Sequence, residues 1–361
     1  MRIAVIPGDG IGKEVAAEAM KVIRRIGEVF GRRFDLEVLP YGADYYLETG
    51  VTLPPGGYAM LRDEFDAIFI GALGDPRVPD MRHAREILLG IRFELDLYVN
   101  YRPVRLLDER LCPLKGRGPG DIDFVVLREN TEGLYVGVGG RFKAGTEDEI
   151  AIQEELNTYK GVSRIIRYAF EHARAMGRRR VAMADKSNAM QHGHALWQRV
   201  FQEVGREYPE IEASHYYIDA LAMQMVRDPS QFEVIVTNNL FGDIITDLGA
   251  ALQGGLGMAA SGNLHPGRTS MFEPVHGSAP KHAGRNVANP IGAILSAALM
   301  LEWLGLKEEA AAVEAAVLDA VRAGQVTRDV GGALGTKETG DYIAGRIGAA
   351  EPRSPGRAAR A

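Results

Sequence analysis

The sequence predicts an α/β fold built on a largely parallel β-sheet. Short runs rich in β-branched residues alternate with longer segments of helical periodicity, which is the pattern of strands joined by helical crossovers. Polar or glycine-rich residues follow each short run at once, and in open α/β sheets the loops after the strand ends hold the ligands. On these grounds strands are expected at residues 3–6, 67–70, 124–127, 181–184 and 234–237.

The first expected strand leads into a glycine-rich loop and then a helix. Gly8, Gly10 and Gly12 form the loop, and apolar residues at helical spacing follow from Val15 to Ile26. The loop is not the G-x-G-x-x-G dinucleotide motif, because position 13 is lysine. The residues alone leave open whether the loop binds a ligand or is only a strand-to-helix turn.

Two carboxylates lie near the start of the helix expected after residues 234–237. Asp243 and Asp247 are four residues apart, so their like charges repel by roughly a few tenths of a kcal/mol unless a cation lies between them. Carboxylates suit hard ions such as Mg²⁺ or Mn²⁺, which bind through one or two side chains, waters and an oxygen-rich substrate. Asp219 can supply a third oxygen. A solvated helix face is the alternative interpretation.

Basic side chains suited to carboxylate ligands lie near the expected strands. Convergence of Arg92, Arg102 and Arg128 would select a di- or tricarboxylate, because guanidinium forks bind carboxylates bidentately. Lys186, after residues 181–184, becomes a base if burial or neighbouring cations lower its pKa, and Tyr135 can relay a proton. Surface ion pairing is the alternative for each cation.

Two further segments contain residues with chemical potential. Residues 273–280 combine small residues and turn-forming proline with His276, which permits close approach by a flat ligand such as a nucleotide base, although a structural turn also fits. His192 and His194 form an H-x-H pair and are interpreted as histidines on a helix surface.

Length and charge narrow the kinds of protein this can be. Its 361 residues suffice for about two domains with large cores. The formal net charge of −6 argues against a polyanion-binding surface, so no nucleic-acid partner is expected. Cys112 is the one cysteine, which excludes an internal disulfide and a cysteine-based zinc cluster and fits a reducing compartment.

No targeting or membrane segment is expected. The first apolar run is far shorter than that of a signal peptide, and Asp9 follows it. The longest apolar stretch, residues 287–301, is interrupted by Asn289 and Pro290 and is shorter than the roughly 20 residues that a bilayer requires, so it predicts a buried helix. A cytoplasmic location without a membrane partner is therefore expected, and residues 351–361 predict a frayed tail.

Taken together, five segments resemble the isocitrate and 3-isopropylmalate dehydrogenase family in order and spacing, from Arg2 to about Ile347. They are residues 7–12, 128–135, 185–188, 239–247 and 273–280. The nearest subgroup resembles tartrate dehydrogenase and D-malate dehydrogenase. Four segments carry that likeness, at residues 44–47, 120–126, 138–141 and 152–154.

The resemblance implies an isopropylmalate-dehydrogenase-like fold of two α/β domains around a cleft, without a Rossmann domain. The cofactor-side domain would combine residues 1–101 with 254–361. Residues 102–253 would form an inserted domain that carries the dimer interface and part of the active site.

The resemblance also implies oxidative decarboxylation of a 2-hydroxy acid. Arg92, Arg102 and Arg128 would bind its carboxylates. Lys186, assisted by Asp219, would take the hydroxyl proton as hydride leaves for nicotinamide, and Tyr135 would protonate the new carbanion. Mg²⁺ or Mn²⁺ would be held by Asp219, Asp243 and Asp247. In the family Lys186 and Asp219 come from the partner subunit, which implies a homodimer with shared active sites.

Cofactor contacts are implied in the first domain. They would come from Ala72, Leu73, Glu273, His276, Gly277, Ser278, Ala279 and Asn289. NAD-using members carry an acid at the position of Lys281, where it binds the adenosine ribose, whereas Lys281, His282 and Arg328 would attract a 2′-phosphate. NADP is therefore expected over NAD, although tartrate and D-malate enzymes mainly use NAD.

Substrate choice rests on fewer residues. Leu88 and Leu89 lie one turn before Arg92, where isopropylmalate and tartrate enzymes both have leucines, while Arg85 replaces a glutamate of isopropylmalate enzymes. The sequence therefore predicts a tartrate- or D-malate-type enzyme, with 3-isopropylmalate dehydrogenase as the alternative and then isocitrate or homoisocitrate dehydrogenase. A catalytically silent regulatory subunit is disfavoured, since the catalytic and metal-binding residue types are all present.

Overall fold

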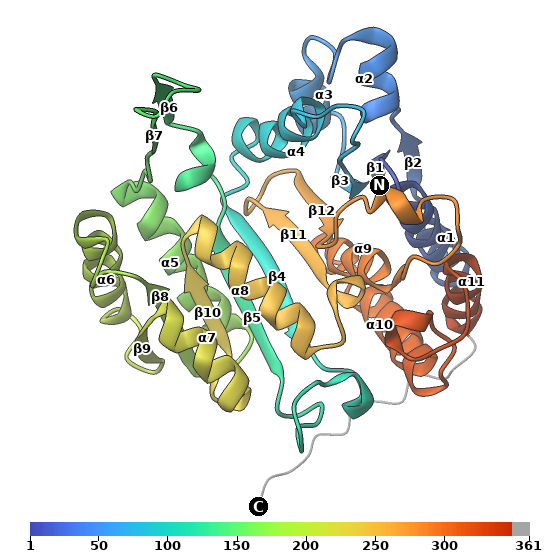
Figure 1. The fold of residues 1–361 in the computed structure, drawn as a ribbon. Coiled ribbons are helices and arrows are strands. Elements are labelled where there is room, and N and C mark those ends of the chain that lie inside the picture. The colour runs from blue at the N-terminus through green and yellow to red at the C-terminus, as the bar shows by residue number, and fades with distance from the viewer. Residues whose placement is uncertain (349–361) are drawn as a thin grey trace, which may run out of the picture. The chain divides into compact units, whose positions relative to one another are not determined.

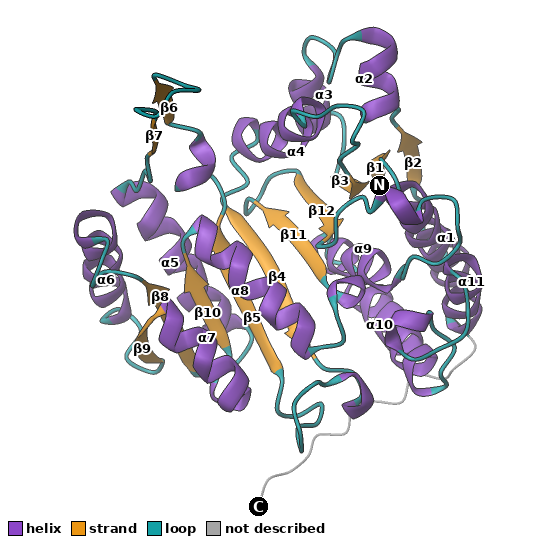
Figure 2. Cartoon of the chain, viewed as in Figure 1, coloured by secondary structure: helices purple, strands orange, loops and turns teal. Residues whose placement is uncertain are grey.

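A computed structural model describes residues 1–348, so the tail expected at residues 351–361 lies outside the described residues. Helices and strands alternate along the described part of the chain (Figures 1 and 2), which confirms the expected α/β class. The chain divides into two compact units, and the division falls inside one helix, α4 (Arg82–Glu94). Among the described residues, 1–87, 257–260 and 271–348 form the first unit, and 88–256 and 261–270 form the second.

In the first unit the strands follow the order β2-β1-β3-β12. β1 pairs in parallel with both β2 and β3, with Ile3 opposite Ala67 and Gly8 opposite Ala72. The ends of β1 and β3 therefore lie level, and the glycine-rich loop begins beside residue 72. The strand bounds are Arg2–Gly8 for β1, Asp35–Val38 for β2, Ala67–Ala72 for β3 and Ser270–Pro274 for β12.

Helices bury the apolar faces of this unit. α1 presents Val15, Val22 and Ile26 to the core, while α9 is buried nearly all round because α1 and α10 both pack against it. The buried helix expected at residues 287–301 is thus observed as α9. The bounds are Gly12–Phe30 for α1, Ala43–Thr49 for α2, Gly57–Asp63 for α3, Ile291–Trp303 for α9, Lys307–Arg322 for α10 and Thr336–Arg346 for α11.

In the second unit the large sheet continues in the order β11-β4-β5-β10-β8-β9. β5, β10, β8 and β9 run parallel, and the register puts Thr237 beside both Arg128 and Ala184. The loops after β5, β8 and β10 consequently leave the sheet at one edge, where ligands of open α/β sheets bind. The bounds are Ala260–Leu264 for β11, Val99–Arg105 for β4, Asp123–Glu129 for β5, Val234–Thr237 for β10, Arg180–Asp185 for β8 and Glu212–Tyr217 for β9.

Two pairs of helices cover this sheet. α5 and α6 pack on one face and α7 and α8 on the other (Figure 1). A hairpin of β6 (Gly139–Phe142) and β7 (Ile150–Gln153) stands away from the sheet, with all eight strand residues exposed. The helix bounds are Tyr159–Ala175 for α5, Gln191–Gly205 for α6, Ile218–Arg227 for α7 and Asn239–Leu252 for α8.

Six short 3-10 helices lie between the longer elements of the described chain. The 3-10 turns span Glu109–Leu111, Leu134–Val136, Pro229–Gln231, Leu256–Met258, Pro280–His282 and Arg328–Val330. Among the described residues, no helix is both long and apolar enough to span a bilayer. The predicted domain boundaries at residues 101 and 253 stay a prediction, because compact units do not by themselves define the bodies that move as domains.

Candidate active site

Asp243 is the centre of a charged cluster at the strand ends of the second unit. Its carboxylate accepts a hydrogen bond from Arg128 Nη1, lies 3.6 Å from Arg102 Nη2, and accepts the Tyr135 hydroxyl at 2.9 Å. Arg92 lies close enough to add its charge to the field at both Arg128 and Tyr135. The structure thus brings together the three predicted substrate arginines, Tyr135 and one predicted metal ligand.

Arg128 fits this site only because a glycine faces it. Arg128 is 1% exposed, and a Cβ built at Gly242 would lie 2.5 Å from its Cγ. Its Nε donates to Asn239 Oδ1 at 2.9 Å, and the Asn239 amide in turn donates to the carbonyl of Glu132. Burial lowers the pKa of Arg128, and Asp243 opposes that effect. Paired polar partners therefore hold a guanidinium that burial alone would disfavour.

The two carboxylates of α8 differ in electrostatic environment. Burial raises the pKa of Asp243, but the charges of Arg128 and Arg102 outweigh it, so the pKa lies below its usual value. Burial also raises the pKa of Asp247, and the nearby charge of Asp243 raises it further. Asp247 makes no hydrogen bond or ion pair with the other described residues, so it is available to a cation.

Asp243 and Asp247 fit a divalent metal as a pair, and Asp219 does not join them in this chain. Within the described part, no group of three or more His, Cys, Asp or Glu side chains is placed to hold a metal ion. Two carboxylates supplemented by water and an oxygen-rich substrate suit Mg²⁺ or Mn²⁺. The described residues supply no third protein ligand beside this pair.

Asp219 instead pairs with Lys186, the residue after β8. Lys186 Nζ lies 2.8 Å from Asp219 Oδ2 and 6.0 Å from the centre of the Tyr217 ring. The hydrogen bond from Lys186 lowers the pKa of Asp219, which favours the ionised form of that carboxylate. The predicted base and its assisting carboxylate are therefore together. Within the described part of the chain, neither forms a hydrogen bond or ion pair with Asp243, Arg102, Arg128 or Tyr135.

Leu88 and Leu89 lie on α4, one turn before Arg92. Both leucines are partly buried, whereas Arg92 is 4% exposed and Arg85 is exposed. Apolar side chains thus precede a buried guanidinium on one helix, as expected for a carboxylate ligand with an apolar substituent.

In the first unit the glycine-rich loop is hydrogen-bonded to the 276–280 segment. The Ile11 amide donates to the Ser278 carbonyl at 2.8 Å, and the Asp9 amide donates to the Ala72 carbonyl at 2.7 Å. A Cβ built at Gly10, whose φ is +53°, would lie 2.1 Å from the Ser278 oxygen. Only glycine allows this approach. The structure therefore gathers Ala72, Leu73 and the Gly277–Ala279 turn around the loop.

The remaining predicted cofactor residues carry polar or charged side chains of the kinds that bind a nucleotide. Burial lowers the pKa of His276, whose Nε2 is buried without a hydrogen-bond partner in the described structure. Asn289 is buried and donates to Asp329 at 3.0 Å, and Glu273 is buried in β12. Lys281, His282 and Arg328 are exposed and form no ion pair with the described residues. An orphaned imidazole nitrogen and free cations fit a phosphate-bearing ligand.

His194 corrects one expectation of the sequence. It was interpreted as a helix-surface residue with His192, and His192 is indeed exposed, but His194 is fully buried. Its ring lies between the Lys186 amide and Glu155, a contact that spans 39 residues of sequence. Glu155, Asn238 and Asn239 are the other polar residues of the site that sequence reasoning missed. A helix cap after a strand was the one signal for Asn238.

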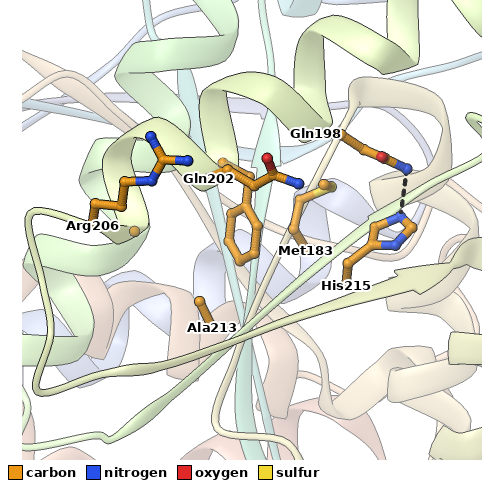
Figure 3. A pocket seen from close by; sticks show the side chains of 8 residues that line it. Met183, Gln198, Gln202, Arg206, Ala213 and His215 are labelled. Carbon is orange, nitrogen blue, oxygen red and sulfur yellow. Dashed lines mark hydrogen bonds between the residues drawn. The ribbon is translucent and has the colours of Figure 1, made fainter.

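A separate cavity of about 440 Å³ lies between α6 and strands β8 and β9 (Figure 3). None of its lining residues belongs to the predicted site. Gln198 and His215 are joined by a 3.3 Å hydrogen bond at its wall (Figure 3). The lining residues are Met183, Gln198, Phe201, Gln202, Gly205, Arg206, Ala213 and His215.

Buried arginines gathered near one carboxylate on an α/β fold favour a ligand that carries carboxylate groups, as in the enzymes that act on organic acids. The chain belongs to the isocitrate/isopropylmalate dehydrogenase family, which it matches over residues 2–343. It is 47% identical to the 3-isopropylmalate dehydrogenase of Thermobifida fusca over 96% of this chain and 98% of that protein. Identity to the 3-isopropylmalate dehydrogenase of Corynebacterium glutamicum is 49%, over 95% and 98%.

A solved structure supports the same conclusion. Isocitrate dehydrogenase from Methylococcus capsulatus superposes with a TM-score of 0.87 at 35% identity, over 96% of this chain and 99% of that one. The family, the fold and the activity of a decarboxylating dehydrogenase acting on a hydroxy acid are thereby confirmed. Membership of this family implies a nicotinamide cofactor and a divalent metal ion. The tartrate and D-malate subgroup has no support among these relatives.

Proposed function

We propose that this protein oxidises and decarboxylates 3-isopropylmalate or a closely related malate with an apolar substituent. The observation that carries the proposal is the convergence of Arg102 and Arg128 on Asp243, with the charge of Arg92 acting on Arg128. Leu88 and Leu89 lie one turn before Arg92 on α4. Guanidinium groups would bind the two carboxylates, and the leucines would contact the alkyl group. Relatives at 47–49% identity carry the name 3-isopropylmalate dehydrogenase.

The proton steps follow from the environments of two side chains. In its neutral amine form, Lys186, held by Asp219, would accept the proton of the substrate hydroxyl while hydride leaves for nicotinamide. Burial raises the pKa of Tyr135, so its phenol stays protonated at neutral pH and can donate to the carbanion carbon after loss of CO₂. A divalent ion on Asp243 and Asp247 would supply Lewis-acid stabilisation of negative charge on the substrate oxygen.

A homodimer with shared active sites is part of the proposal. Asp219 does not join Asp243 and Asp247 within one chain, which is expected if Lys186 and Asp219 serve the site of a partner subunit. Large exposed apolar side chains mark two candidate contact surfaces. Met223, Val226 and Ile244 lie on α7 and α8, and Phe142, Ile150 and Ile152 lie on the β6–β7 hairpin.

Preference for NADP over NAD is the finer cofactor proposal. It rests on three exposed side chains, Lys281, His282 and Arg328, which form no ion pair with the described residues and are therefore open to a 2′-phosphate. A Lys281→Asp substitution would replace attraction by repulsion and is expected to move the preference towards NAD. Lys307, at the start of α10, provides a matched surface control.

Initial rates of reduced-nicotinamide formation test both proposals. We would cross 3-isopropylmalate, D-malate, tartrate and isocitrate with NAD and NADP, with and without EDTA, for the wild type, Lys281→Asp and Lys307→Asp. EDTA-sensitive turnover of 3-isopropylmalate with NADP is expected, together with loss of the NADP preference in Lys281→Asp alone. A preference for D-malate or tartrate would refute the substrate proposal, and a wild-type preference for NAD would refute the cofactor proposal.

A further inference from the structure

We propose that His194 is a positioning residue. In one neutral tautomer, its ring accepts a hydrogen bond from the backbone of Lys186 and so holds the loop of residues 186–190 in place. The inference rests on the proposed role of Lys186 as the base. The Lys186 amide donates to His194 Nδ1 at 2.7 Å. Because the backbone N–H is the donor, Nδ1 is the unprotonated nitrogen, and Nε2 must carry the ring proton.

Glu155 selects that tautomer from the other side of the ring. Its Oε1 lies 3.2 Å from His194 Nε2, and the side chains are 8% and 1% exposed. Burial raises the pKa of Glu155, but hydrogen bonds from His194 and Asn238 outweigh it, so the pKa lies below its usual value and the group is a carboxylate. A buried carboxylate beside Nε2 favours a proton on that nitrogen.

The Glu155 carboxylate also links the loop of residues 186–190 to α8, the helix that carries Asp243 and Asp247. Asn238 Nδ2 donates to Glu155 Oε1 at 2.7 Å, while Asn238 Oδ1 caps α8 by accepting the Phe241 amide at 2.8 Å. α8 then carries Asp243 and Asp247. Glu155 and His194 therefore form a buried bridge between the start of α8 and the backbone of Lys186.

A second set of bonds holds the residue before the lysine. Asp185 Oδ1 accepts the Ser187 amide at 3.0 Å and lies 2.9 Å from His215 Nε2. The Ala189 and Met190 amides both donate to the Lys186 carbonyl. Within the described structure, His194 is thus the hydrogen-bond acceptor that holds the Lys186 amide. Loss of that acceptor would leave a buried donor unpaired and let the loop shift.

The test compares two substitutions at position 194. In His194→Asn the side-chain oxygen can take the place of Nδ1 and keep the acceptor, whereas His194→Leu is close to histidine in volume and has no acceptor. We expect kcat to fall by about 10- to 100-fold in His194→Leu with little change in KM, because misplacement of a catalytic group costs rate rather than binding. Most of kcat should return in His194→Asn, and His192→Leu on the same helix should match the wild type.

Two readouts do not depend on turnover. Hydrogen exchange of the Lys186 amide should accelerate in His194→Leu but not in His194→Asn, and ¹⁵N NMR of the wild-type ring should show protonated Nε2 and bare Nδ1. Equal losses of kcat in both variants, wild-type kcat in His194→Leu, or a proton on Nδ1 would each overturn the proposal. An inactive wild type with the expected tautomer would instead refute the proposed function.

Discussion

Arg128 illustrates how a single residue of this site depends on its neighbours. Its guanidinium lies 5.0 Å from the centre of the Tyr135 ring, bonded to Asp243 and Asn239. An unpaired buried charge costs several kcal/mol, so each partner is as necessary as the arginine itself. The close approach of α8 that allows these bonds requires glycine at position 242.

Gly242→Ala is therefore expected to damage both stability and substrate binding. The added methyl would meet Arg128 Cβ at 2.6 Å and Cγ at 2.5 Å, which lie near the backbone and cannot swing away. Such overpacking destabilises by about 1–3 kcal/mol and would displace the guanidinium. Urea unfolding should show the loss, and KM for the hydroxy acid should rise.

Gly345→Ala is the matched control, because the same methyl at that exposed position of α11 meets nothing within 4 Å. It should leave KM unchanged and stabilise the protein by up to about 1 kcal/mol through helix propensity. A Gly242→Ala protein with wild-type KM and unfolding free energy would contradict the proposed packing constraint.

His172 is expected to lower the free energy of unfolding as the pH falls. It packs beside Tyr101 and Tyr168, and burial together with the charge of Arg178 lowers its pKa from 6.5 to about 4. Because the unfolded chain binds the proton first, stability is full above about pH 6.5 and falls as the pH drops towards about 4. The shift corresponds to of order 3 kcal/mol at about 1.4 kcal/mol per pKa unit.

His172→Phe should remove this dependence while keeping an aromatic ring in the core. Free energies of unfolding measured by urea titration between pH 4 and pH 7 should then vary less in the variant than in the wild type. Parallel curves for the two proteins across that range would show that His172 does not titrate as its surroundings indicate.

At the scale of elements, α7 and α8 combine predicted site residues with an exposed apolar surface. The helices carry Asp219, Asp243 and Asp247, while Met223 and Ile244 are 51% and 58% exposed. Grouped apolar residues on two packed helices indicate a contact surface more strongly than isolated ones. If this surface forms the proposed dimer interface, dimer formation would also complete each active site.

Met223→Glu is expected to weaken the dimer and lower activity together. A carboxylate placed in an apolar interface loses its hydration without a partner. Sedimentation should show a larger monomer fraction, and kcat per chain should fall at low protein concentration and recover at high concentration. Val38→Glu on β2, where the valine is 61% exposed, should change neither property. A monomeric but fully active Met223→Glu protein would refute the shared site.

At the scale of the whole molecule, binding of a metal ion should appear as a gain in unfolding free energy. A ligand at about 100 times its Kd adds about 2.7 kcal/mol to the state that binds it. Mn²⁺ with substrate should therefore raise the Tm of the wild type, and Asp247→Asn should abolish the rise. Asp35→Asn, a change at an exposed carboxylate of β2, is the control. A full Tm shift in Asp247→Asn would exclude Asp247 as a ligand.

The five expected strands were all found, because each is a short β-branched run whose burial needs no distant information. Among the strands that were missed, β4 and β11 contain polar residues, Asn100 and Asn263, that are buried against one another only in the folded sheet. His194 was misjudged for the same reason. Its partner Glu155 comes from a segment that no local pattern connects to α6.

The sequence by itself determined the α/β class, the family and the residue types of the site, because strand runs, glycine turns and ordered motifs are local features. Tertiary structure decided which charges meet: Asp243 with Arg102, Arg128 and Tyr135, and Asp219 with Lys186. It also decided that His194 is buried and faces the Lys186 amide. Sheet register sets these contacts, since aligned strand ends bring together loops that are more than 50 residues apart in the chain.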